Sequence, residues 1–150
     1  MAIFEDNMAL KNIYEVFDEF KNVKTKQERI DILRKNNSWA LRSVLQGVFH
    51  PNVKFNIAIP EYKKVDVPAG MSYDHMTSAL QRAYLFQEGN PKTPAGLTDK
   101  RKTELLIQIL ESLEPKEAEV FVNMMRKDLK VPYLTQGLVN EAFEGLLPKS

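Results

Sequence analysis

Apolar residues recur at helical spacing in one segment after another of this chain, and asparagine, proline or glycine separates the segments. Residues 8–21 are typical, and Asn7 can cap the helix that they would form. Five apolar side chains then fall on one face: Leu10, Ile13, Tyr14, Phe17 and Phe20. Spacings of three and four residues put side chains on the same face of an α-helix, whereas a half-buried strand needs strict alternation. The pattern predicts a helix with an apolar stripe that faces the core.

Two further helices are expected before residue 51. Thr25 and Glu28 have the spacing of a capping box, in which the threonine hydroxyl accepts a backbone N–H and the glutamate reaches back. The helix that they start should end at residues 36–37. A third helix, capped by residue 37 or 38, should stop at His50 because the following Pro51 disfavours helical geometry. Its apolar side chains are Trp39, Leu41, Val44, Leu45, Val48 and Phe49.

Prolines and glycines mark two long loops. Three prolines and a glycine interrupt residues 50–70, and the apolar run at 55–59 among them is too interrupted for a sheet. Two glycines and two prolines interrupt residues 89–96. We interpret both segments as ordered loops between helices.

Four more helices are expected in the rest of the chain. The first covers residues 72–87, and the next starts with a cap at Thr98 or Asp99. Another starts at Pro115, because proline suits the first turn of a helix, and the last is capped by Thr135. Residues 1–150 are therefore predicted to form a single compact all-α domain of about seven helices with two long ordered loops.

No group of residues has the spacing of a catalytic or metal site. Lys64-Val-Asp66 is similar to the lysine motif of nucleotidyltransferases, but it lacks the glycine and lies in a proline-flanked loop. His50 and His75, the only histidines, have no partner at a suitable spacing. Four acids are interpreted as a solvated face: Glu111, Glu114, Glu117 and Glu119. We expect no enzymatic activity, no catalytic residue, no metal, no cofactor and no small-molecule substrate.

The distribution of charge favours a basic surface, although the net charge is only +1. Residues 1–20 carry five acids and one base, whereas residues 21–54 carry eight bases and two acids. Further bases cluster at the start of the fifth predicted helix and at the end of the sixth. Cations near helix ends can hold phosphates without reading bases.

Two parts of the chain resemble the helical N-terminal DNA-binding domain of ATP-dependent DNA ligases. They are Ile-Leu-Arg-Lys-Asn at 32–36 with the helix end at 41–55, and the Met-Met-Arg run within 120–131. The resemblance covers roughly residues 25–147 and implies a DNA-ligase N-terminal-domain-like fold. In those ligases the domain grips duplex DNA through its backbone, largely without sequence specificity. The chain also resembles short proteins of large tailed phages in which such a domain stands alone.

The resemblance adds positions to the basic residues. By position, Lys35 and Asn36 match the Lys-Asn of the family, Arg126 matches its basic residue, and Lys130 lies where the family approaches a Gly-rich turn. Here Pro132 and Tyr133 replace that turn, which removes one amide donor and adds bulk. The predicted DNA-binding residues are Lys26, Arg34, Lys35, Asn36, Arg42, Arg101, Arg126, Lys127 and Lys130.

Two functions remain open from the sequence. The first is a non-catalytic accessory protein that binds duplex DNA without sequence specificity in phage DNA metabolism. The alternative is an interaction or virion-associated structural protein that contacts a phage or host protein through the loop around Tyr62 or through residues 89–96. The chain has no cysteine and no apolar run of roughly 18 residues, so we expect no membrane partner and a cytoplasmic location, or one in the virion.

Overall fold

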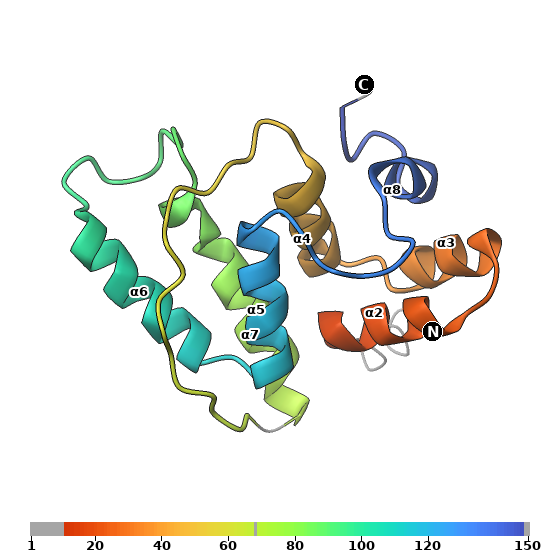
Figure 1. The fold of residues 1–150 in the computed structure, drawn as a ribbon, viewed down its shortest axis with the longest axis horizontal. Helices are drawn as coiled ribbons and strands as arrows, with labels where there is room; N and C mark the ends of the chain where they lie inside the picture. Colours follow the sequence, from red (N-terminus) through yellow and green to blue (C-terminus); the bar gives the residue numbers. More distant parts are fainter. Residues whose placement is uncertain (1–10, 68, 149–150) are drawn as a thin grey trace, which may run out of the picture.

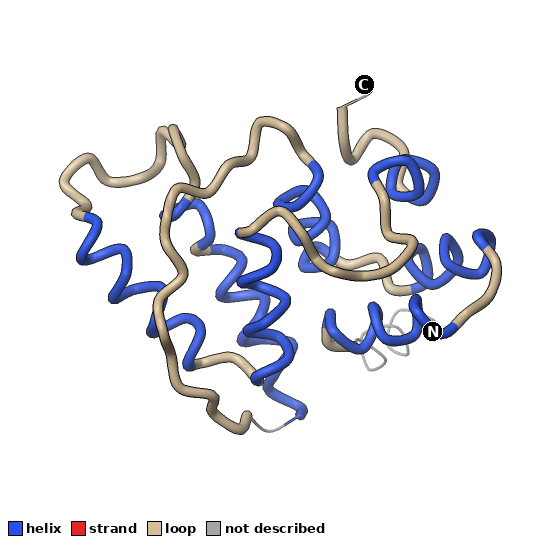
Figure 2. Tube along the Cα trace, in the orientation of Figure 1, coloured by secondary structure: helices blue, strands red, loops and turns tan. Residues whose placement is uncertain are grey.

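The computed structural model describes residues 11–67 and 69–148, and within these ranges every regular element is helical (Figures 1 and 2). The α-helices are α2 (Ile13–Asn22), α3 (Lys26–Lys35), α4 (Trp39–Phe49), α5 (Ala69–Gln81), α6 (Asp99–Glu111), α7 (Pro115–Met125) and α8 (Gln136–Ala142). A 3₁₀ helix, η1 (Ala83–Phe86), follows α5. The prediction of an all-α fold is confirmed.

Helix α7 lies at the centre of the arrangement. It packs against α2, α4, α5 and α6, and eight of its eleven residues are buried. Helix α3 packs against both α2 and α8, so these three helices form one side of the molecule, while α6 lies at the opposite edge (Figure 1). The buried residues of these helices belong to one hydrophobic core cluster. The central position of α7 explains why most of its residues are buried, including the polar Glu117 and Asn123.

A glycine allows the close approach of α4 to α7. A Cβ atom added at Gly47 would lie 2.6 Å from both Cγ and Sδ of Met124. Met124 is itself buried, so its side chain has little room to move away. Gly47 is therefore required by packing, although glycine in a helix costs roughly 1 kcal/mol relative to alanine.

The predicted caps of four helices are confirmed. A side-chain hydroxyl accepts a backbone N–H three residues ahead at each of Thr25, Ser38, Thr98 and Thr135. At Thr25 the second half of the capping box differs from the prediction, because the Glu28 carboxylate accepts the threonine hydroxyl at 2.9 Å. Each hydroxyl satisfies one of the backbone donors that a helix start leaves without a partner.

The predicted start of the first helix is wrong within the described residues. The structure places Lys11 and Asn12 outside the helix, which begins at Ile13, and the proposed cap Asn7 lies outside the described residues. Glu15 accepts the backbone N–H of Asn12 at 3.1 Å, and this contact stabilises the observed start.

The predicted helix over 72–87 is also wrong at both ends, since α5 covers Ala69–Gln81 and the tighter η1 follows. The backbone of the long loop after α4 pairs with the backbone at the end of η1. The N–H of Asn56 donates to the Phe86 carbonyl at 3.1 Å, and the N–H of Glu88 donates to the Lys54 carbonyl. Phe55 and Gln87 form an antiparallel bridge. The backbone must be extended at Gln87 to make this bridge, so the α-helix cannot continue.

Trp39 was grouped with the apolar stripe of the third helix, but its side chain is 45% exposed. It lies nine residues before Val48, about two and a half turns at 3.6 residues per turn. The two side chains are therefore on opposite faces of α4, and only the Val48 face meets the core.

Candidate functional site

The loop between α7 and α8 crosses in front of α4 and ends beside α3 (Figure 1). It contains three residues other than glycine with a left-handed backbone: Lys127 (φ 62°), Lys130 (φ 58°) and Tyr133 (φ 69°). This conformation costs an L-residue roughly 1–2 kcal/mol. Three such residues within seven positions indicate that the surroundings hold the loop in one shape, which is typical of functional segments.

The left-handed backbone of Lys127 is explained by the hydrogen bonds that end α7. The N–H of Asp128 donates to the Asn123 carbonyl and the N–H of Lys127 to the Met124 carbonyl, both at 3.0 Å. This pair of bonds is the Schellman motif, whose left-handed position usually holds glycine. Here the lysine ammonium donates to the carbonyls of His50 (2.9 Å) and Val53 (2.6 Å). Burial, with a contribution from Lys54, lowers the pKa of Lys127. Lys127 therefore ties the end of α7 to the end of α4.

The other two left-handed residues shape the rest of the loop. The N–H of Lys130 donates to Asp128 Oδ1 at 3.0 Å. The N–H of Leu134 donates to the Val131 carbonyl at 3.3 Å, which closes a turn with Pro132 and Tyr133 at its centre. A turn with proline second and a positive φ third has the geometry of type II, in which glycine is usual at the third position.

Tyr133 projects its ring outward from this turn. The side chain is 61% exposed, and the guanidinium carbon of Arg29 lies 3.8 Å from the ring centroid. The Nη2 of Arg29 also donates to the Val23 carbonyl at 3.2 Å. One part of the ring therefore stacks on a cation that α3 holds in place.

Lys130 borders three hollows in the surface. One of about 260 Å³, the α2–α7 hollow, is lined by Tyr14, Phe17, Asp18, Lys21, Lys116, Glu119, Val120, Asn123, Leu129, Lys130 and Val131. A second of about 440 Å³, the Tyr62 hollow, is lined by Ile59, Pro60, Glu61, Tyr62, Glu119, Val122, Asn123, Arg126 and Lys130. The third lies between the loop and the end of α4. The side chains of Arg126 and Lys130 are exposed and make no hydrogen bond or ion pair within the described part of the chain. They are the unneutralised cations of this loop.

Besides Lys127, three of the predicted DNA-binding residues make contacts with other parts of the described chain. The ammonium of Lys26 lies 2.8 Å from a carboxylate oxygen of Glu141. Arg34 donates to the carbonyls of Ala142 (3.1 Å) and Glu141 (2.9 Å), which are at the end of α8. Asn36 donates to the carbonyl of Ile32 in its own helix. The two cations hold α8 against α3, as expected for positive charge near the negative end of a helix.

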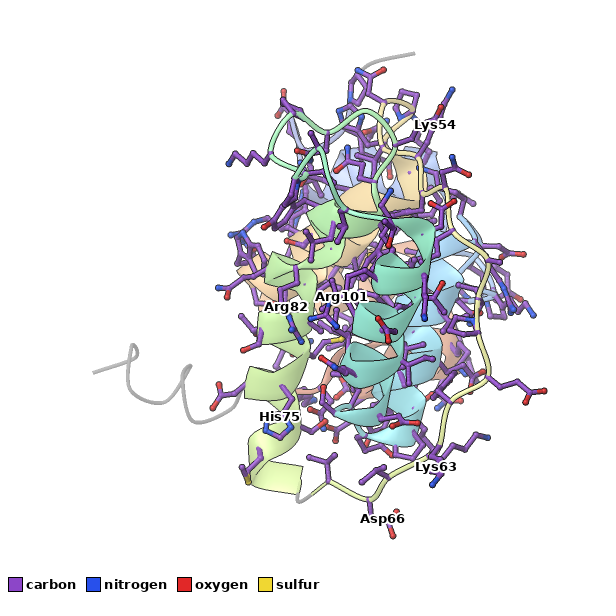
Figure 3. All side chains as sticks on the ribbon, turned by 90° about the vertical axis from the view of Figure 1, so that its left-hand side faces the viewer. Lys54, Lys63, Asp66, His75, Arg82 and Arg101 are labelled. Carbon is purple, nitrogen blue, oxygen red and sulfur yellow. The ribbon has the colours of Figure 1, made fainter. Side chains whose placement is uncertain are left out.

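The remaining predicted residues come from different elements. Arg42 donates to Asn37 Oδ1, and Arg101 lies 3.7 Å from Glu104. Arg101 belongs to the α5–α6 side that faces the viewer in Figure 3, whereas α3 lies at the opposite edge in Figure 1. Lys35 is exposed at the end of α3. The nine residues therefore do not gather on one face: four belong to α3 and its C-cap, and three lie at or just after the end of α7.

The interpretation of the acidic residues as a solvated face is wrong for Glu117. Its side chain is fully buried in the first turn of α7, where its carboxylate accepts the N–H of Ile13 at 3.1 Å and of Tyr14 at 2.7 Å. Burial raises the pKa of Glu117 to about 7, the two backbone hydrogen bonds oppose the rise, and the nearby Glu114 and Glu15 add to it. A residue of one helix thus caps another across the core.

Arg29 and Tyr133 were not among the predicted site residues. Pro132 and Tyr133 stood out in the sequence only as a departure from the Gly-rich turn of the ligase domain, and the stacking of Arg29 joins positions more than a hundred residues apart. No spacing rule connects such positions. Exposure and the left-handed backbone were the properties that pointed to Tyr133, and both required the structure.

A family model described as a family of unknown function (DUF6433) matches residues 16–131. The matched part begins in α2 and ends within the α7–α8 loop. No curated protein and no solved structure matches the chain. Among the described residues, no helix is long and apolar enough to cross a membrane.

Proposed function

The chain belongs to the DUF6433 family, and from its own geometry we propose that it is a non-catalytic accessory protein that binds the backbone of duplex DNA without sequence specificity. The observation that carries this proposal is the pair of Arg126 and Lys130. Both are exposed, both lie on one loop held in a strained shape, and neither forms an ion pair with any residue that the structure describes. The proposed setting is phage DNA metabolism in the host cytoplasm.

The electrostatics of the loop support a phosphate as its ligand. Residues 126–134 carry three bases and one acid, and one of the bases, Lys127, is already used by backbone carbonyls. The backbone that carries these cations is held in one shape, and contacts from lysine and arginine to phosphate oxygens position a protein without reading sequence. The resemblance of the Met-Met-Arg run to the ligase domain supports the same ligand. A site with few cations implies modest affinity and a small dependence on salt.

Binding of a fluorescent duplex measured against salt concentration tests this function. Each phosphate contact contributes a slope of about −0.9 in log affinity against log salt. We expect the double variant Arg126→Gln with Lys130→Gln to bind more weakly and to have a slope less steep by about 1.8. The matched control, Lys92→Gln with Lys100→Gln, removes the same charge from exposed positions outside the loop. Equal slopes for the wild type and the loop variant, or an equal loss in the control, would contradict the proposed site.

A protein partner is the second candidate, and one observation favours it. Glu61 and Glu119 line the same Tyr62 hollow as Arg126 and Lys130, so this surface carries both signs of charge. A polyanion is repelled by the acids, whereas a protein surface can present complementary charges to each group. Wild-type protein that shows no salt-dependent binding to duplex DNA at low salt would reject the first function in favour of this one.

A further inference from the structure

Tyr133 has a left-handed backbone conformation, which glycine adopts more easily than tyrosine. The third position of its turn has φ 69°, a conformation that glycine adopts without strain. Burial does not compensate for the strain, because the side chain is 61% exposed. Neither the backbone nor the hydrophobic core accounts for a tyrosine at this place. The stack on Arg29 at this exposed position offsets only part of the conformational cost, so the ring points to a contact outside the chain.

The ring is fixed before any ligand arrives. Arg29 stacks at 3.8 Å from the ring centroid and is itself held by the Val23 carbonyl, so α3 supports the ring from one side. Pro132 restricts the backbone just before the tyrosine. The hydrogen bond from Leu134 to Val131 closes the turn around it. A planar surface supported in this way loses little conformational freedom when a second planar group stacks on it.

The supporting cation limits what that second group can be. Both faces of an aromatic ring carry partial negative charge, and the Arg29 guanidinium already covers one face of Tyr133. A lysine or arginine of a protein partner would be repelled by the guanidinium across the ring. A neutral, flat, polarisable nucleobase is not repelled, and bases stack on aromatic side chains with little regard to sequence.

The same loop also carries a cation that could bind a phosphate. Lys130 lies three residues before Tyr133, and its exposed side chain makes no hydrogen bond or ion pair within the described residues. A base inside an intact duplex has both faces covered by its neighbours. A base at an end, gap or single-stranded junction has one face free, and its own phosphate can reach a cation of the loop.

We propose that Tyr133, supported by Arg29, is a stacking platform for an unpaired nucleobase, so that the protein prefers DNA with a junction between duplex and single strand over uninterrupted duplex. This inference rests on the proposed function, because it assigns a substrate class to the same α7–α8 loop. It adds a base contact to a site that otherwise grips only phosphates.

Two DNA probes with the same duplex sequence test the inference. One is a dumbbell whose strands are closed by loops of a flexible non-nucleoside linker, and the other carries a short single-stranded overhang. We expect the wild type to bind the overhang probe roughly 5-fold to 150-fold more tightly, which is the effect of one aromatic stacking contact. Tyr133→Gly should remove this preference and leave the affinity for the dumbbell unchanged.

Two substitutions at Tyr133 distinguish the loss of the aromatic ring from a change in the stability of the fold. Glycine suits the left-handed position, so Tyr133→Gly removes the ring without straining the turn. The matched control Tyr133→Phe keeps both the ring and the backbone strain, and it should keep the preference for the overhang. A Tyr133→Gly protein that still prefers the overhang would refute the platform.

The remaining outcomes distinguish the two proposals. Wild-type protein that binds both probes equally, with a salt slope that Arg126→Gln and Lys130→Gln reduce, overturns the platform and leaves the proposed function standing. Wild-type protein that binds neither probe overturns both, and a protein partner then becomes the explanation for the exposed ring.

Discussion

Replacing Glu117 by glutamine should remove a large part of the pH dependence of folding. The carboxylate of Glu117 is buried between α7 and α2, and its two oxygens accept the N–H groups of Ile13 and Tyr14. Glutamine has nearly the same shape but cannot ionise. Its amide nitrogen also cannot accept a hydrogen bond, so one of the two backbone donors loses its partner.

The magnitude follows from the pKa. Burial raises the pKa of Glu117 from 4.5 to about 7, and each unit corresponds to 1.36 kcal/mol. The folded state thus holds the proton more tightly than the unfolded chain by about 3 kcal/mol. Because the folded pKa is the higher one, this contribution to stability is complete below pH 4.5 and is lost as the pH rises to about 7. Above about pH 7 this contribution is lost completely, and Glu117 no longer makes the free energy of unfolding depend on pH.

Urea unfolding followed by circular dichroism between about pH 5 and 8 measures this effect. We expect the free energy of unfolding of the wild type to fall across this range, and that of Glu117→Gln to fall by roughly 2–3 kcal/mol less. The control Glu119→Gln removes the same charge from an exposed position two residues along α7, and it should follow the wild type. Parallel curves for the wild type and Glu117→Gln would refute the assignment of a raised pKa to this buried group.

Two further substitutions test the packing around the end of α7. Gly47→Ala places a Cβ within 2.6 Å of the buried Met124 side chain and should lower the free energy of unfolding by about 1–3 kcal/mol; an unchanged urea midpoint would mean that Met124 moves aside at no cost. Lys127→Met leaves the two carbonyls at the end of α4 without their donor and should cost roughly 1.5–3 kcal/mol. Lys130→Met, at the other left-handed lysine of the loop, removes no such contact and should change stability by less than about 0.5 kcal/mol; a similar loss in both variants would show that the ammonium contacts of Lys127 are not the cause.

Local features of the fold could be predicted because their causes lie within a few residues. A threonine or serine hydroxyl at a helix start bonds the N–H three residues later, as at Thr25 and Thr135. Pro115 stands in the first turn of α7 and His50 ends α4, as the prolines indicated. These contacts need no knowledge of the rest of the chain.

The features that could not be predicted have causes that lie far away in the sequence. Helix α5 ends at Gln81 because a loop some thirty residues earlier pairs with the backbone around Gln87. Sequence also did not indicate that Lys26 and Arg34, which stay predicted DNA-binding residues, contact α8. Sequence shows that a side chain is charged and near a helix end, but not which other helix lies beside it.

The fold and the candidate site differ in how far they depend on local sequence and how far on tertiary packing. Periodic apolar positions, capping residues and prolines were enough to determine that this is a helical protein and where most of its helices begin, because short-range hydrogen bonds and burial of one helix face decide those features. Only the packing of α2, α3, α7 and α8 decided that Glu117 is buried, that Arg29 supports Tyr133, and that Arg126 and Lys130 stay unpaired. Those properties depend on groups about a hundred residues apart, which meet only when the core has formed.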